Sequence, residues 1–77
     1  MKVADLLHSR RENWRELERL CLELEGRSKR TVTAPKAARF ATLYRAVCAD
    51  LALADAYQIP PGTIDYLHRL VGRAHNQ

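Results

Sequence analysis

Residues 33–63, TAPKAARFATLYRAVCADLALADAYQIPPGT, contain one helix together with the signals that start and stop it. Thr33 is a suitable N-cap, and Pro35 falls in the first turn, where a missing N–H costs nothing. Pro60 and Pro61 cannot continue a helix. The stretch therefore predicts a helix from about Ala34 to Tyr57, followed by a break.

Apolar residues recur along this helix at the three- and four-residue spacing of one helical face. Alanines occupy most of the remaining circumference, which permits close packing on more than one side. The helix is therefore predicted to be the central one of its domain. The predicted apolar stripe consists of Ala37, Phe40, Ala41, Tyr44, Val47, Cys48, Leu51 and Ala54.

Two further helices flank the central one. Residues about 2–25 carry an apolar stripe that Arg10 interrupts, and Gly26 ends the segment as glycine does at a C′ position. Glu12 can pair with Arg15, Glu16 with Arg19, and Arg19 with Glu23, at helical neighbour spacing. The members of this stripe are Val3, Leu6, Leu7, Trp14, Leu17, Leu20, Cys21 and Leu24. Residues about 62–75 form the third helix, with an apolar face of Ile64, Leu67, Leu70, Val71 and Ala74.

Short connections make neighbouring helices antiparallel, and 77 residues leave room for one domain only. We therefore predict an all-α fold, a three-helix antiparallel bundle over residues 1–77. In the first two antiparallel helices, residues at the same height along the axis can be matched in pairs. This matching places Trp14 beside Tyr44 or Val47 and separates Cys21 from Cys48 by roughly 15 Å along the axis. Because a disulfide needs Cα atoms within about 7 Å, no intramolecular disulfide is expected.

Positive charge is concentrated in the middle of the chain. The protein has a formal net charge of +4, whereas residues 26–49 contain Arg27, Lys29, Arg30, Lys36, Arg39 and Arg45 and no acidic residue. Such a segment either contacts an anion or keeps a loop and a helix face solvated. The partner in the first case would be phosphate, an anionic lipid surface or an acidic protein. The candidates for this anion-contacting patch are Arg27, Lys29, Arg30, Lys36 and Arg39.

The sequence offers no constellation of residues for catalysis. Ser9 and Ser28 lack a base and an orienting acid at a recognisable spacing. His68 and His75 lie seven residues apart, without the further ligands that a metal site needs. Both cysteines lie on apolar stripes, and no glycine-rich phosphate loop is present. We therefore predict a non-catalytic protein with no cofactor and no metal.

No segment predicts a signal peptide or a membrane span. The N-terminus lacks the apolar region and the small-residue cleavage site of a signal peptide. The longest apolar runs, residues 46–49 and 51–54, are far shorter than the about 20 residues that cross a bilayer.

The aromatic residues are assigned to two roles. Trp14, Phe40 and Tyr44 fall at core spacings, which favours packing. Tyr57 and Tyr66 are candidates for a partner interface.

Asp50 and Arg73 have two interpretations. Asp50 lies next to the apolar stripe of the central helix, and Arg73 lies near the end of the third helix. They either form an ion pair that locks these helices together or remain two separate solvent-facing charges.

Several short motifs, taken in order, resemble one known family. They are Arg10-Arg11-Glu12-Asn13-Trp14, Leu17-Glu18-Arg19-Leu20, Leu43-Tyr44-Arg45, Asp50-Leu51-Ala52 and Leu70-Val71-Gly72-Arg73-Ala74-His75. This ordered set resembles the N-terminal region of the stage II sporulation protein M (SpoIIM-like) family of bacterial integral membrane proteins. The positions that the resemblance marks as structural or interface residues are Trp14, Leu43, Tyr44, Arg45, Asp50, Arg73 and His75.

The resemblance implies a helical domain that precedes transmembrane helices, so that this chain is the N-terminal part of a longer protein. It also implies a location at the cytoplasmic face of the bacterial cell membrane. The implied role is protein–protein interaction or scaffolding, because the member that gives the family its name resembles a membrane scaffold that gathers peptidoglycan-degrading partners. No catalytic or cofactor residue carries over.

Two other hypotheses remain open. A small nucleic-acid-binding regulator would use the basic 26–49 region and bind duplex DNA in a salt-dependent manner. A soluble adaptor would form a homo-oligomer through the alanine-rich side of the central helix.

Overall fold

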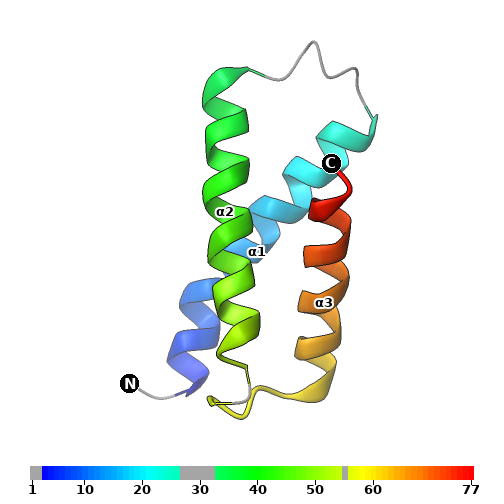
Figure 1. Ribbon diagram of the computed structural model, residues 1–77. Coiled ribbons are helices and arrows are strands. Elements are labelled where there is room, and N and C mark those ends of the chain that lie inside the picture. The colour runs from blue at the N-terminus through cyan, green and yellow to red at the C-terminus, as the bar shows by residue number, and fades with distance from the viewer. Residues whose placement is uncertain (1–2, 27–32, 55) are drawn as a thin grey trace.

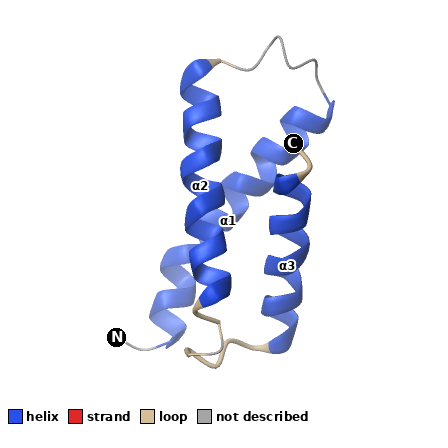
Figure 2. Cartoon of the chain, in the orientation of Figure 1, coloured by secondary structure: helices blue, strands red, loops and turns tan. Residues whose placement is uncertain are grey.

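The computed structural model describes residues 3–26, 33–54 and 56–77, and these residues form three helices and no strand. Helix α1 spans Val3–Gly26, α2 spans Ala34–Ala52 and α3 spans Pro61–His75 (Figure 2). Figure 1 shows α2 running antiparallel to α1 and α3, while α1 crosses obliquely behind α2 and ends near the C-terminal end of α3. The predicted all-α three-helix bundle is confirmed.

The signals read from the sequence set the starts of α2 and α3. The Thr33 hydroxyl accepts a hydrogen bond from the Lys36 backbone N–H at 3.3 Å, as an N-cap does. Pro61 is the first residue of α3, where its fixed φ suits the helix and its missing N–H costs nothing. Arg73 and His75 lie in the last turn of α3, where positive charge is favourable.

Helix α2 ends at Ala52 rather than at the predicted Tyr57. The chain turns early because Ala54 and Ile59 are both buried, and the Ile59 N–H donates to the Ala54 carbonyl at 3.0 Å. Gln58 adopts a left-handed φ of 51°, which reverses the chain between them. Burial of Ile59 thus ends a helix that local propensity alone would have continued.

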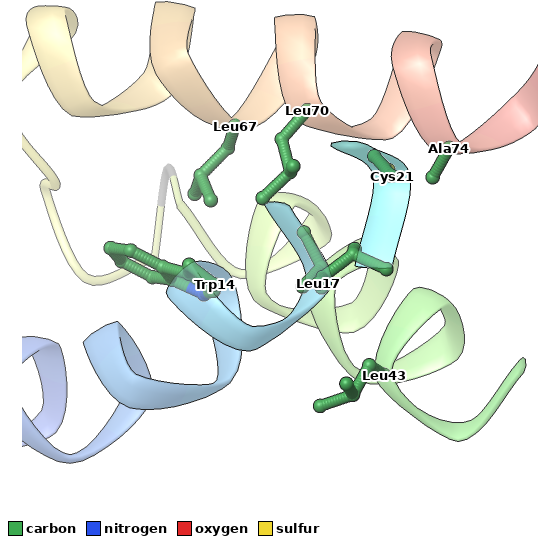
Figure 3. Packing of buried hydrophobic residues seen from close by; sticks show 8 residues of the cluster. Trp14, Leu17, Cys21, Leu43, Leu67, Leu70 and Ala74 are labelled. Atoms are coloured by element: carbon green, nitrogen blue, oxygen red, sulfur yellow. The ribbon is translucent and has the colours of Figure 1, made fainter. Parts of the chain in front are cut away.

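The core lies where the three helices meet (Figure 3). The predicted faces of α1 and α3 are confirmed at their centres, while the side chains of Val3 and Leu6 fall outside the described set. On α2 the buried face is centred on Leu43, Val47 and Asp50, so that Phe40, Tyr44 and Leu51 of the predicted stripe lie at its edges. The buried cluster comprises Trp14, Leu17, Cys21, Leu43, Val47, Leu67, Leu70 and Ala74.

The bundle is long and thin, with extents of 41 × 20 × 15 Å. A helix with its side chains is about 10 Å across, so one layer of side chains fills the space between neighbouring helices. A side chain that contacts a ligand therefore has to lie on the surface or in a shallow hollow between helices. None of the helices in the described ranges is long and apolar enough to cross a membrane.

Candidate functional site

A buried carboxylate joins α1 to α2. Asp50 is 7% exposed and accepts a 2.8 Å hydrogen bond from the indole Nε1–H of Trp14. The guanidinium Nε of Arg10, one turn before Trp14 on α1, lies 3.4 Å from the other oxygen of Asp50. Arg10, the residue that interrupts the apolar stripe in the sequence, thus supplies the counter-charge. Every buried side-chain nitrogen and oxygen in the described part of the chain has a partner.

The predicted ion pair between Asp50 and Arg73 is wrong, and so is the alternative of two free charges. Arg73 instead donates two 2.6 Å hydrogen bonds to Glu25 at the end of α1. The antiparallel arrangement of α2 and α3 explains the difference, because it places His75 level with Tyr44. Asp50 lies six residues further along α2 than Tyr44, about 9 Å away along the helix axis.

The remaining residues marked by the resemblance serve different purposes. Leu43 is fully buried in the core. The Tyr44 hydroxyl and His75 Nδ1 lie 3.3 Å apart and connect the α2 and α3 surfaces. Arg45 is exposed and makes no ion pair with any described residue. These positions therefore do not converge on one site.

The predicted anion-contacting patch is divided between two environments. Lys36 Nζ lies 3.0 Å from Glu23, and Arg39 forms a two-point pair with Glu16 at 2.6 and 2.9 Å. Both cations therefore hold α2 against α1. The predicted pairs within α1, of Glu12 with Arg15 and of Arg19 with Glu16 and Glu23, do not form. Contact of the patch with an external anion stays a prediction, since its other members, Arg27, Lys29 and Arg30, lie outside the described residues.

The ion pairs Arg39–Glu16 and Arg73–Glu25 predict that acid destabilises the fold. Hydrogen bonds from Arg39 and Arg73 lower the pKa of Glu16 and Glu25, respectively, below the ordinary value of 4.5. A carboxylate with a lowered folded-state pKa stabilises the fold above its ordinary pKa, and this contribution is lost as pH falls through the lowered value. We expect the thermal midpoint to fall between about pH 5 and pH 3, and to fall less steeply in the Arg39→Gln/Arg73→Gln variant.

Arg45→Gln is the matched control for this experiment, because it removes an exposed arginine that forms no ion pair with a described residue. It should retain the wild-type pH slope, measured by circular dichroism at fixed ionic strength. An Arg39→Gln/Arg73→Gln variant with the wild-type slope would show that these two pairs do not cause the acid sensitivity.

An apolar hollow opens at the end of the bundle where the α2–α3 connection meets α1. It has a volume of about 50 Å³ and lies above the Asp50 carboxylate. Two of its large apolar side chains are exposed to solvent, Leu53 to 44% and Tyr57 to 39%. The sequence predicts Tyr57 as an interface candidate but does not single out Leu53 or Ile59. The exposure of Leu53 and the burial of Ile59 both depend on where α2 ends, which the sequence pattern places too late. The hollow, with the rim formed by Leu53 and Tyr57, is lined by Leu7, Arg10, Trp14, Asp50, Leu53, Tyr57 and Ile59.

A second surface feature is a depression between α1 and α3 that is lined by both charged and apolar residues, and we call it the α1–α3 groove. It consists of two adjoining hollows of about 360 and 250 Å³ that share Glu18 and Tyr66. Tyr66 packs against Trp14 with ring centroids 6.3 Å apart. Burial, and then the neighbouring Glu18 carboxylate, raise the pKa of Tyr66. The charged and aromatic residues along the groove are Arg11, Arg15, Glu18, Tyr66, Arg69 and Arg73.

The described residues do not bring metal ligands together. No group of three or more His, Cys, Asp or Glu side chains in residues 3–26, 33–54 and 56–77 could hold a metal ion. Cys21 is buried, which raises the pKa of its thiol, and Cys48 is half-buried; neither forms a disulfide. The surface hollows present apolar side chains and guanidinium groups, which can bind a partner by apolar contact and by ion pairing.

Comparison with known proteins identifies the family of the chain. The model of a family described as a domain of unknown function (DUF8413) matches residues 4–77. No curated protein and no solved structure matches the chain. Because the matched region covers almost the whole sequence, the chain belongs to the DUF8413 family.

Proposed function

We propose that this chain is a non-catalytic protein-interaction domain of a SpoIIM-like protein, scaffolding partners at the cytoplasmic face of a bacterial membrane. The observation that carries the proposal is the pair of exposed apolar side chains, Leu53 and Tyr57, beside the hollow at the α2–α3 end. Large apolar and aromatic residues around a small pocket are typical anchors of protein interfaces. The hollow is too small for a typical metabolite but accepts a single side chain.

The two ends of the bundle differ in a way that suits this role. The C-terminus lies at the opposite end of the bundle from the α2–α3 connection (Figure 1). Gln77 is held there by a 3.2 Å hydrogen bond from its side chain to Glu25. If membrane helices follow, as the resemblance implies, the end carrying Leu53 and Tyr57 would face away from the bilayer and remain accessible to partners.

We rank protein contact ahead of nucleic-acid binding. Lys36 and Arg39 belong to the basic 26–49 region but pair with carboxylates of α1. Of the described cations in that region, Arg45 alone makes no ion pair. Phosphate binding by Lys36 or Arg39 would first have to break an existing pair, which lowers the electrostatic gain.

The proposal is tested on the native gene product in its own cells. A photo-reactive amino acid at position 57 should yield discrete cross-linked protein adducts, because Tyr57 is expected to lie in the interface. The same amino acid at position 45, which is exposed on α2 and distant from the hollow, is the matched control and should yield few. In parallel, the product should have an apparent mass well above 8.8 kDa and resist alkaline extraction from membranes.

Two outcomes contradict the proposal separately. A product of 8.8 kDa that alkali extracts completely would remove the membrane assignment. Equal cross-linking yields from positions 57 and 45 would remove the interface at Leu53 and Tyr57.

A further inference from the structure

The α1–α3 groove carries positive charge that the fold itself does not use. Arg11 and Arg15 are exposed, lie one turn apart on α1, and make no ion pair with any described residue. Arg69 on α3 is likewise exposed and unpaired within the described part of the chain. Like charges at this spacing destabilise an isolated helix by a few tenths of a kcal/mol. Glu12 and Glu18 lie three residues from Arg15 on either side but form no ion pair with it, so the charge of Arg15 stays available to a ligand.

The floor of the groove is apolar and aromatic. Tyr66 is half-buried and its ring contacts the buried ring of Trp14. Leu70 is buried where the second hollow opens. A ligand in the groove would thus meet guanidinium groups on both walls and apolar surface beneath them, a combination that matches an acidic chain with an apolar side chain.

Glu18 narrows the choice among acidic ligands. Its carboxylate lies in the shared part of the two hollows, beside the Tyr66 hydroxyl. A continuous row of phosphates, as in nucleic acid or a lipid surface, would bring like charge against Glu18. A peptide avoids this repulsion, because its backbone N–H groups can donate to the Glu18 carboxylate while its acidic side chains reach the arginines.

We infer that the α1–α3 groove binds an acidic peptide segment of a partner protein, with Arg11, Arg15 and Arg69 pairing its carboxylates and Tyr66 contacting an apolar side chain. This inference rests on the proposed interaction function and names the chemistry of one partner. The groove is a different surface from the rim formed by Leu53 and Tyr57. The distance from Arg11 to Glu18 along α1 is about 10 Å, which corresponds to three or four extended peptide residues.

The test is a titration of the full 77-residue chain with synthetic peptides, followed by NMR of the arginine Nε–H signals and by Trp14 fluorescence. A short peptide of glutamate and leucine should bind saturably and shift the signals of Arg11, Arg15 and Arg69. A matched peptide with glutamine in place of glutamate should bind at least about tenfold more weakly. The Arg11→Gln/Arg15→Gln/Arg69→Gln variant should also lose about tenfold in affinity for the acidic peptide.

Arg45→Gln is the matched control for the variant, since it removes an exposed arginine that lies outside the groove and pairs with none of the residues that the structure describes. It should leave the affinity within about twofold of wild type. The inference is overturned by the absence of saturable binding up to about 1 mM peptide. It is also overturned if Arg45→Gln weakens binding as much as the groove variant does. Tighter binding of a short DNA duplex or of phosphatidylglycerol vesicles to the same arginines would assign the groove to phosphate instead.

This titration is independent of the cell experiment. A groove that fails to bind the acidic peptide, together with cross-linking from position 57, would overturn only the inference about the groove. Binding of the peptide without cross-linking or membrane retention would overturn the proposed scaffold at the α2–α3 end and leave the groove in place.

Discussion

Leu17→Ala is expected to lower the free energy of unfolding by about 3 to 5 kcal/mol, the cost typical of removing a fully buried leucine side chain and leaving a cavity. Leu17 has no exposed surface and lies at the centre of the core, where α1 faces both other helices. Figure 3 shows its side chain among those of Leu43, Leu67 and Leu70. A thin bundle has no second layer that could collapse into the cavity, so the cost should fall in the upper part of the range.

The loss is large compared with the total stability. A domain of this length is stabilised by about 4 to 12 kcal/mol in all, so Leu17→Ala should lower the thermal midpoint by more than about 10 °C. Thermal unfolding followed by circular dichroism measures the shift. Leu22→Ala is the matched control, because Leu22 lies on the same helix and is 56% exposed. Equal losses for the two variants would show that the centre of α1 does not face a common core.

Asp50→Ala is expected to lower the free energy of unfolding by about 2 to 4 kcal/mol. It leaves the buried Trp14 N–H without an acceptor and Arg10 without its counter-charge, and an unsatisfied buried donor costs about 1 to 3 kcal/mol by itself. The loss of the Arg10 pair adds less, because Arg10 is 40% exposed and water solvates it. Trp14 is the sole tryptophan, so its fluorescence follows unfolding directly.

Asp50→Asn separates the hydrogen bond from the charge. Asparagine keeps an oxygen that can accept from Trp14 at nearly the same volume, and we expect a loss of about 1 kcal/mol. In a Trp14→Phe background the indole donor is absent, so Asp50→Ala should cost at least about 1 kcal/mol less than in the wild type. Equal costs of Asp50→Ala in both backgrounds would mean that the hydrogen bond between Trp14 and Asp50 contributes nothing measurable.

The sequence predicts most of the fold because its signals are local. Thr33, Pro35 and the pair Pro60-Pro61 mark helix boundaries through their own geometry, whatever else the chain does. The apolar faces of α1 and α3 repeat at regular spacing over several turns, so that Leu17 and Leu67 are identified as core residues from the pattern alone.

The face of α2 and the partners of its charges are not local properties. Asp50 looks like a surface residue in the sequence, and its burial requires Arg10 and Trp14, about 40 residues earlier on α1. Ile59 ends α2 early only because it is buried against the folded bundle. The α1–α3 groove likewise exists only once α1 lies beside α3, so single-sequence patterns cannot predict it.

The packing of α1 against both of the helices that follow it has a consequence for biosynthesis. Helix α1 leaves the ribosome first, yet the residues that cover Leu17 and Cys21 come from α2 and α3, as late as Ala74. At about 5 to 20 residues per second, synthesis of the intervening chain takes roughly 2 to 10 s. Helix α2 can pair with α1 as soon as α2 is made, through the Lys36–Glu23 and Arg39–Glu16 ion pairs, whereas the side of α1 that faces α3 stays uncovered until α3 is complete. Docking of α3 is therefore expected to close the core, and until then an unfinished chain exposes the side of Leu17 and Cys21 that α3 covers.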